Sequence, residues 1–483
     1  MEKIKKLFSY DRSLTSFVNE DGKKITLLSL AVPIFFESVL RILMGTVNSM
    51  VLSRYTETAA GAIGTATTIL NFLMMLFSMV STGVTVIIIQ NLGAGNRKRA
   101  GEAASLSIAF CALMSLLVGG LASGSANWLM GSLMKLEGQQ LDEAVKYFRI
   151  VAEFNFVSTL IVVLGAITRS YGNTRMTFIV AMIMNGFNAI FSSVVIFRPF
   201  EVPLYGIEGV ATGRVLAEAL ALIINIIFMF KLKIDFSFKA IIKPKLDLIK
   251  EIIQFGVPSG IGSISYSIST MVSTIFISGF GPVAVSAKAY LSSVTFYSAL
   301  VGSSMGQATS ILVGRNVGRG DMDRAYRLGL QTLKAGIASN VFFAIIMCIF
   351  TGPIYRLLFN ASDEIINLVQ PIMAIDILTE AGRAMNNVEE GALRSSGDVV
   401  YQMAIGLSSC WLVSVLFSYI FGVVCGLGLT GCWIAFAMDE LTRGMLYFVR
   451  WRSKKWMEKR IIRDDELETA PATAIDEAEE QKD

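Results

Sequence analysis

Two long apolar stretches of the chain each carry ionisable side chains in the same helical spacing. In residues 26–52 and 365–394 two sets of residues follow the spacing i, i+4, i+7 and i+11, which places each set on one face of a helix. Carboxylates and arginines inside an apolar helix can bind a proton, a cation or a charged substrate. The first set is Glu37, Arg41, Met44 and Asn48, and the second is Asp376, Glu380, Arg383 and Asn387.

The arginine in each set lies about one helical turn from a glutamate, and this spacing leaves two interpretations open. Glu37 with Arg41, and Glu380 with Arg383, can form ion pairs that only neutralise charge within the helix. Alternatively, one carboxylate alternates between its arginine and a proton or substrate. Interior arginines also favour an anionic or zwitterionic ligand, because a guanidinium group matches carboxylate and phosphate through two hydrogen bonds.

The elements that carry these residues are long enough to cross a lipid bilayer. Of 483 residues 53% are hydrophobic and only 17% are charged, with a mean hydropathy of +0.59. Residues 106–134 and 401–424 contain no charged side chain. Both exceed the roughly 20 residues that span about 30 Å of hydrocarbon. The composition therefore predicts an all-α integral membrane protein.

Twelve such stretches follow one another, and their loops separate by charge. Lysines and arginines gather at 3–24, 97–99, 231–245, 319–324 and 450–460, whereas the alternate loops carry scattered single cations. The positive-inside rule then places both termini in the cytoplasm and the protein in the cell membrane. The expected spans are 26–52, 59–91, 103–131, 146–170, 174–197, 207–231, 249–279, 284–315, 327–351, 365–394, 399–423 and 429–451.

The chain contains an internal repeat with an offset of 225 residues. The stretch from Gln90 to Ala100 recurs from Arg315 to Ala325, and the same offset relates Pro33 to Pro258. It also relates Arg169-Ser170 to Arg394-Ser395 and Gly172 to Gly397. Six spans per copy is an even number, so both copies enter the membrane in one orientation. This predicts two pseudo-symmetric six-helix bundles related by an axis along the membrane normal, with a cavity between them.

The repeat also sets the expected domain organisation. Residues 1–25 form a cytoplasmic segment, 26–231 the N-terminal bundle, 232–248 a basic cytoplasmic linker, 249–452 the C-terminal bundle and 453–483 a disordered tail. Within the repeated motif, the glycines are expected to form tight turns at the ends of spans 2 and 8. The Asn or Asp that follows them is expected to cap the next helix.

Several classes of protein are excluded by what the chain lacks. It has no histidine, no nucleophile motif and no phosphate-binding loop, so no enzyme, ATP-driven pump or cofactor is expected. No metal is expected beyond a sodium ion. The basic residues lie at span ends, which argues against nucleic acid as a partner. The five cysteines show no metal-ligand spacing.

These motifs together resemble those of the MATE (multidrug and toxic compound extrusion) transporters. The resemblance rests on Pro33 with Leu43-Met44-Gly45, on Gly93-Ala94-Gly95-Asn96, on Gly206-Ile207-Glu208-Gly209 and on Arg394 with Gly397-Asp398, and it covers residues 25–455. It implies two six-helix bundles in a V around a central cavity, and export of organic, often cationic, compounds against inward sodium or proton flow. The wider superfamily includes lipid-linked oligosaccharide flippases.

The sequence departs from the family pattern at the positions where MATE transporters usually carry acids. Asn48 occupies the acidic position of span 1, Ser192 follows the retained Asn188 in span 5, Tyr266 replaces the span 7 glutamate and Arg383 the span 10 aspartate. A coupled proton would therefore need Glu37, Glu153, Asp376 or Glu380, with Glu153 near an interface. Glu389 and Glu390 near the cytoplasmic end of span 10 are expected to face the loop region.

The sequence thus predicts a secondary active transporter that exports small organic compounds, cationic or amphipathic, by sodium- or proton-coupled antiport. The alternative is a flippase or exporter of an anionic or lipid-linked substrate. The expected partners are a small-molecule substrate and the lipid bilayer, and the protein is expected to be a monomer. The expected site residues are Glu37, Arg41, Asn48, Glu153, Asn188, Ser192, Tyr266, Asp376, Glu380, Arg383 and Asn387.

Overall fold

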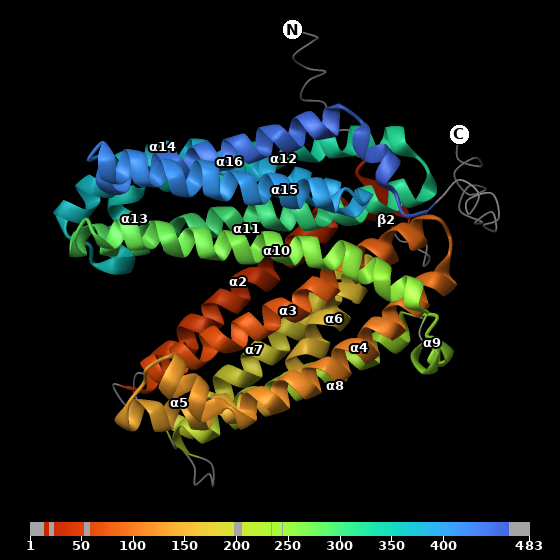
Figure 1. The fold of residues 1–483 in the computed structure, drawn as a ribbon, viewed down its shortest axis with the longest axis horizontal. Helices are drawn as coiled ribbons and strands as arrows, with labels where there is room; N and C mark the ends of the chain where they lie inside the picture. Colours follow the sequence, from red (N-terminus) through yellow and green to blue (C-terminus); the bar gives the residue numbers. More distant parts are fainter. Residues whose placement is uncertain are drawn as a thin grey trace. The chain divides into compact units, whose positions relative to one another are not determined.

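The computed structural model is almost entirely helical (Figure 1). It describes residues 14–18, 24–52, 58–197, 205–232, 234–243 and 245–462, without the side chains of 18, 45–52 and 238. Two compact units divide the chain. We call Phe36–Ile88 with Arg97–Val257 the N-terminal lobe, and the described residues up to Phe35, Ile89–Asn96 and those from Pro258 onward the C-terminal lobe. The domain boundaries expected at residues 231 and 249 stay a prediction.

The helices appear in the order that the apolar stretches predict. The elements are β1 (Ser16–Val18), β2 (Lys24–Thr26), α2 (Leu27–Leu52), α3 (Ala59–Gly93), α4 (Arg97–Gly124), η1 (Trp128–Leu133), α5 (Gly138–Glu153), α6 (Asn155–Ser170), α7 (Thr174–Phe197), α8 (Gly206–Lys231), α9 (Phe238–Ile242), α10 (Leu246–Ser278), α11 (Pro282–Arg319), α12 (Met322–Ile349), α13 (Thr351–Phe359), α14 (Asp363–Ser396), α15 (Val399–Ser409), η2 (Cys410–Val415), η3 (Ser418–Val424), α16 (Gly428–Arg452) and η4 (Lys455–Lys459).

Each of the twelve expected spans falls on one of these helices or on consecutive helices. Within the described residues, nine spans, including the run Val399–Val424, are long and apolar enough to cross a membrane, and α5 with α6, bent by 52°, adds a tenth. The remaining two are α11 and α16, with 38 and 25 residues. At about 1.5 Å per residue both exceed the thickness of the hydrocarbon layer. Their lower hydropathy follows from the polar residues that they carry.

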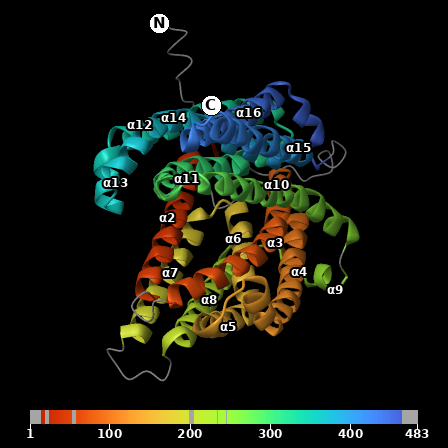
Figure 2. The ribbon, with the colours of Figure 1, turned by 60° about the vertical axis from the view of Figure 1, so that its left-hand side comes forward.

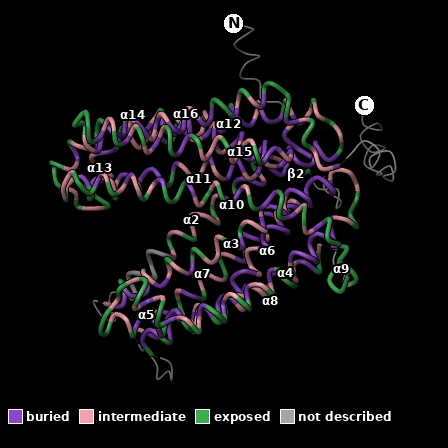
Figure 3. Tube along the Cα trace, in the orientation of Figure 1, coloured by how far each residue is buried: buried purple, intermediate pink, exposed green. Residues whose placement is uncertain are grey.

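The helices of each lobe present apolar side chains outward, as expected for contact with lipid. On α4, Leu113, Leu117 and Leu121 follow one another at every fourth position and are exposed. The buried face of the same helix carries Ser115 and Gly119. Small residues allow close helix packing, and apolar residues cover the lipid-facing surface. Figure 3 shows buried and exposed positions alternating along the helices in this way.

The repeat appears in the backbone at the helix ends. Gly95 and Gly320, and likewise Gly172 and Gly397, all have positive φ angles, between 77° and 101°. Each glycine lies in a turn that ends a helix, which the sequence predicts for Gly95 and Gly320. The bonds that close these turns match at the same offset: Asn96 N to Asn91 O (2.8 Å), Asp321 N to Asn316 O (3.0 Å), Asn173 N to Thr168 O (3.1 Å) and Asp398 N to Leu393 O (2.9 Å).

Gly93 and Gly318 lie where two helix backbones cross closely, and not in turns. A Cβ atom at Gly93 would lie 2.2 Å from the carbonyl oxygen of Arg315, and one at Gly318 would lie 2.0 Å from that of Gln90. These two contacts are reciprocal in the repeat and bring the ends of α3 and α11 together within the C-terminal lobe. The glycines therefore permit a close crossing of two backbones, which the sequence pattern alone did not distinguish from a turn.

We expect Gly318→Ala to destabilise the protein by about 1–3 kcal/mol, because the added methyl group forces the two backbones apart. Thermal unfolding in detergent, followed by tryptophan fluorescence, measures this change. The control is Gly120→Ala on α4, where a Cβ atom meets nothing within 4 Å. That control should be neutral or slightly stabilising because alanine favours helix. Equal unfolding midpoints for Gly318→Ala and the wild type would contradict the crossing.

A short hairpin precedes the first span, which the sequence did not predict. Strands β1 and β2 pair antiparallel with Ser16 opposite Thr26. The guanidinium carbon of Arg315 lies 4.2 Å from the centre of the Phe17 ring, and Arg324 donates a hydrogen bond to the Ser16 carbonyl at 3.3 Å. The hairpin therefore contacts the repeated motif of the C-terminal lobe. Three-residue strands gain little stability by themselves, so these contacts are expected to stabilise the hairpin.

Helix α14 forms the centre of the C-terminal lobe and packs against α11, α12 and α16. Figure 2 shows α11, α12, α14 and α16 grouped in this lobe. In the N-terminal lobe, α8 packs against α5, α6 and α7. These contacts bring polar residues of different helices together within each lobe.

Candidate functional site

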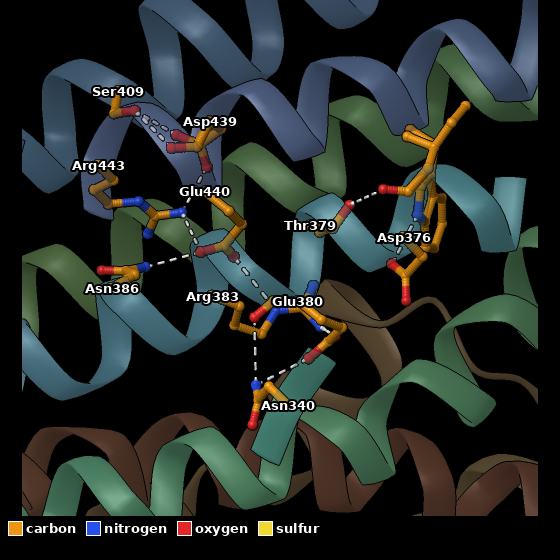
Figure 4. A network of polar contacts seen from close by, with 12 residues as sticks. Asn340, Asp376, Thr379, Glu380, Arg383, Asn386, Ser409, Asp439, Glu440 and Arg443 are labelled. Atoms are coloured by element: carbon orange, nitrogen blue, oxygen red, sulfur yellow. Dashed lines mark hydrogen bonds and ion pairs between the residues drawn. The ribbon is translucent and has the colours of Figure 1, made fainter. Parts of the chain in front are cut away.

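A network of charged side chains connects α14 with α16 in the C-terminal lobe (Figure 4). Arg383 contacts Glu380 on its own helix, and its Nε lies 3.6 Å from Oε1 of Glu440 on α16. One turn further along α16, Nη2 of Arg443 lies 2.5 Å from Oδ2 of Asp439 and 3.6 Å from Oε2 of Glu440. Glu440 therefore bridges the two arginines.

Neutral side chains complete the hydrogen bonding of the three carboxylates. Asn340 of α12 donates to Glu380 at 3.1 Å, and Asn386 donates to Glu440 at 2.9 Å. Ser409 donates to Asp439 at 2.5 Å. All three carboxylate residues are buried. With every group ionised, three carboxylates face two guanidinium groups, so the network has one excess negative charge.

Other residues expected from the sequence lie near this network. Asp376 is buried and accepts a hydrogen bond from the indole nitrogen of Trp433 at 3.0 Å. The guanidinium carbon of Arg443 lies 5.5 Å from the centre of the Tyr266 ring. Asn387 lies against α11, where a Cβ atom on Gly302 would be 3.0 Å from its amide nitrogen.

A second polar site is a cavity of about 490 Å³ within the N-terminal lobe, formed by α2, α3, α6, α7 and α8. Glu37 is its main acidic group on α2. Its carboxylate lies 3.3 Å from Arg169 of α6, accepts a hydrogen bond from Thr177 of α7 at 2.9 Å and lies 3.6 Å from Arg41. Glu37 thus connects three helices.

The other acidic group of the cavity is Glu218 on α8. Arg214 contacts it at 3.0 Å, and Ser158 of α6 donates a hydrogen bond to its second oxygen. Arg214 also donates to the Tyr147 hydroxyl at 3.0 Å. The lining residues are Glu37, Arg41, Asn71, Met74, Met75, Ser78, Ser158, Ile161, Val162, Gly165, Arg169, Thr177, Val180, Ala181, Met184, Asn185, Arg214, Glu218 and Asn225.

The remaining expected residues are not brought into this cavity. Glu153 is exposed at the end of α5. Asn188 and Ser192 are buried on α7 and contact each other at 3.4 Å, without lining the cavity. The side chain of Asn48 falls outside the described residues.

The expectation that Glu389 faces the loop region is wrong. Its side chain is fully buried, and neither carboxylate oxygen has a hydrogen-bond partner among the described residues. The cause is the packing of α14 against α11, which continues beyond position 389, where a Cβ atom on Gly391 would lie 2.4 Å from the carbonyl oxygen of Gly306. Glu390 is partly buried and binds Arg394 at 3.2 Å and Gln402 at 2.8 Å.

The sequence interpretation missed two ion pairs, although the repeat contains a signal for them. Arg214 and Glu218 on α8 correspond, at the offset of 225, to Asp439 and Arg443 on α16. Both are pairs of oppositely charged residues four positions apart, and both pairs are formed. The order of the charges is reversed between the two lobes. A search at the established offset would have identified both pairs.

A chain of this architecture, with twelve spans in two repeats and charged groups inside each repeat, belongs to the class of membrane transporters. The family model MatE matches residues 33–194 and 258–420, two segments that begin 225 residues apart. The chain is a member of this family, the MATE transporters. It is an all-α integral membrane protein of twelve spanning helices in two pseudo-symmetric six-helix bundles, and it is not an enzyme.

Relatives and solved structures agree with this assignment. The uncharacterized transporter YisQ of Bacillus subtilis is 33% identical over 446 residues, covering 92% of this chain and 98% of the relative. The probable multidrug resistance protein NorM of Thermotoga maritima is 26% identical over 436 residues, covering 90% and 93%.

Two solved structures share the fold at 17% identity and a TM-score of 0.81. One is a multidrug resistance MATE family transporter in an outward-facing conformation, covering 88% of this chain and 94% of that chain. The other is a MOP superfamily transporter from Pyrococcus furiosus, reported with a binding pocket of reverse polarity, covering 90% and 96%.

Proposed function

We propose that this protein exports small organic compounds by antiport against sodium ions or protons, through alternating access of its two lobes. The observation that carries the proposal is the polar cavity of the N-terminal lobe. Its volume of about 490 Å³ lies within the range of roughly 300–1,000 Å³ that small-molecule sites occupy. It is built from helices that cross the membrane, where charged groups are costly unless they are paired or hydrated and therefore indicate a functional site.

Glu37 is the carboxylate best suited to couple transport to an ion. It lines the cavity, and it contacts groups from α2, α6 and α7. Binding of a proton or a sodium ion would weaken its attraction to Arg169 and free these helices to rearrange. A change in the contacts of one carboxylate would then reach three helices, which is the kind of differential interaction that a conformational switch requires.

The orientation follows from the charges of the loops. Both termini and the basic segment 232–248 lie in the cytoplasm, because lysine and arginine concentrate there.

The test of coupling uses the purified full chain in liposomes, with a sodium gradient and a pH gradient imposed separately. A fluorescent organic cation and a fluorescent organic anion are followed in parallel. We expect one gradient to drive uptake, and Glu37→Gln to abolish the response to that gradient, because the amide cannot take up a proton and has no charge to attract sodium.

The matched control is Asp142→Asn on α5, an exposed carboxylate that does not line the cavity. It should transport like the wild type. The coupling role of Glu37 would be refuted by gradient-driven uptake that Glu37→Gln leaves intact.

A second candidate is an exporter of an anionic or lipid-linked substrate. Three arginines line the cavity together with two glutamates, and this composition favours a substrate with an acidic group over a simple cation. In the transport assay, uptake of the anion alone would support this candidate.

A further inference from the structure

The charged groups of the N-terminal cavity do not balance. Arg41, Arg169 and Arg214 line it against Glu37 and Glu218, which leaves one positive charge when all five are ionised. Both glutamates are already engaged, Glu37 by Arg169 and Thr177, and Glu218 by Arg214 and Ser158.

Of the three arginines, Arg41 is the most accessible to a further partner. Its side chain is 70% exposed, whereas those of Arg169 and Arg214 are 22% and 25% exposed. It lies 3.6 Å from Glu37, farther than Arg169 at 3.3 Å, and that carboxylate also accepts the Thr177 hydrogen bond. A guanidinium group inside a membrane-spanning helix is stabilised only by water or by a counter-ion. Arg41 lines the cavity, and its five N–H groups can donate hydrogen bonds to a further acceptor there.

The rest of the lining is suited to an organic body. Met74, Met75 and Met184 come from α3 and α7, and their flexible, polarizable side chains adapt to varied apolar shapes. Asn71 and Asn185 add amide groups beside them. The cavity thus combines one excess positive charge with an adaptable apolar wall.

We infer that this cavity binds the acidic group, a carboxylate or a phosphate monoester, of an amphipathic organic anion, with Arg41 as its direct partner. The inference rests on the proposed function, because it takes the cavity to be the substrate compartment. The anion's head lies against Arg41 through two parallel hydrogen bonds, and its apolar part lies on the methionines.

The experiment measures equilibrium binding in nanodiscs without any gradient, so that it is independent of transport. The probes are pyrenebutyrate and a pyrenebutyl trimethylammonium ion, which share an aromatic body and differ in charge. We expect wild-type protein to bind the carboxylate more tightly than the ammonium ion. Arg41→Gln should weaken carboxylate binding by about tenfold or more, as expected for a lost charge-assisted hydrogen bond.

The matched control is Arg149→Gln on α5, an exposed arginine that does not line the cavity, and it should bind like the wild type. Arg41→Lys, which keeps the charge, should recover part of the carboxylate affinity. Thermal unfolding of each variant verifies that the fold is intact. Tighter binding of the ammonium ion by wild-type protein, or carboxylate binding that Arg41→Gln leaves unchanged, would overturn the inference.

Nanodiscs of zwitterionic lipid and nanodiscs with added phosphatidic acid distinguish the source of the anion. If phosphatidic acid competes with the carboxylate probe, the site is supported and its natural acidic group belongs to a lipid. If phosphatidic acid does not compete while the carboxylate probe binds, the ligand is a soluble anion. Carboxylate binding that persists without gradient-driven transport would contradict the proposed function and leave this site intact. Gradient-driven transport without carboxylate binding would contradict this site and leave the proposed function intact.

Discussion

Arg383→Gln is expected to reduce gradient-driven transport by about 100-fold or more while the protein still inserts and folds. Arg383 bridges Glu380 and Glu440, so it connects α14 to α16 at the polar centre of the C-terminal lobe. Without it, three buried carboxylates face Arg443 alone. Removing one partner of a buried pair costs about 3–5 kcal/mol. If about 3 kcal/mol of this cost falls on one transport state and not on the other, it corresponds to the expected factor.

The double variant Glu380→Gln with Arg383→Gln separates a role in transport from a role in stability. It removes one charge of each sign, so the net charge of the network is unchanged. We expect the double variant to recover most of the thermal stability lost in Arg383→Gln and to remain inactive in the liposome assay. Recovery of transport together with stability would reduce Arg383 to a structural role, and normal transport by Arg383→Gln would refute its role in transport.

The spans and the repeat were predictable because both are encoded locally. An apolar run of sufficient length forms a helix in a membrane whatever its neighbours are, since its backbone bonds are all internal. The turn glycines were likewise predictable, because Gly95 and Gly320 recur with the same flanking residues and adopt the same left-handed conformation.

The partners of the charged residues were not predictable from spacing along one helix. Glu37 lies near Arg41 as expected, yet its closer partners are Arg169 and Thr177, 132 and 140 positions away. Helix packing decides which faces meet, and a single sequence does not encode that directly. Glu389 illustrates the same point, because its position near a helix end indicated solvent while its side chain lies in the lobe interior.

The two lobes reuse one pattern with opposite polarity. In α8 the arginine precedes the glutamate, and in α16 the aspartate precedes the arginine, at equivalent positions of the repeat. Each pair joins a larger set of charges, with one positive charge in excess in the N-terminal cavity and one negative charge in excess in the C-terminal network. A duplicated scaffold has therefore retained the helix geometry and diverged in the charge that each lobe offers.

The stability of the C-terminal lobe should depend strongly on Arg443. We expect Arg443→Leu to lower the free energy of unfolding by about 3–5 kcal/mol, because buried Asp439 loses its arginine partner and Glu440 loses one of its two. Thermal unfolding in detergent, followed by tryptophan fluorescence, measures the loss. Adding Asp439→Asn to this variant should restore part of it, since the amide removes one of the unpaired charges.

The matched control is Arg356→Leu on α13, which also removes an arginine from an ion pair. Arg356 lies 2.7 Å from Asp363, but the two side chains are 66% and 80% exposed. Exposed pairs contribute about 0–1 kcal/mol because water solvates both charges when the pair is broken. Burial therefore predicts a much larger effect at Arg443 than at Arg356, although the two ion pairs have similar lengths. Equal effects of the two substitutions would show that the buried network contributes no more than a surface contact and would remove the basis for its role in coupling the helices.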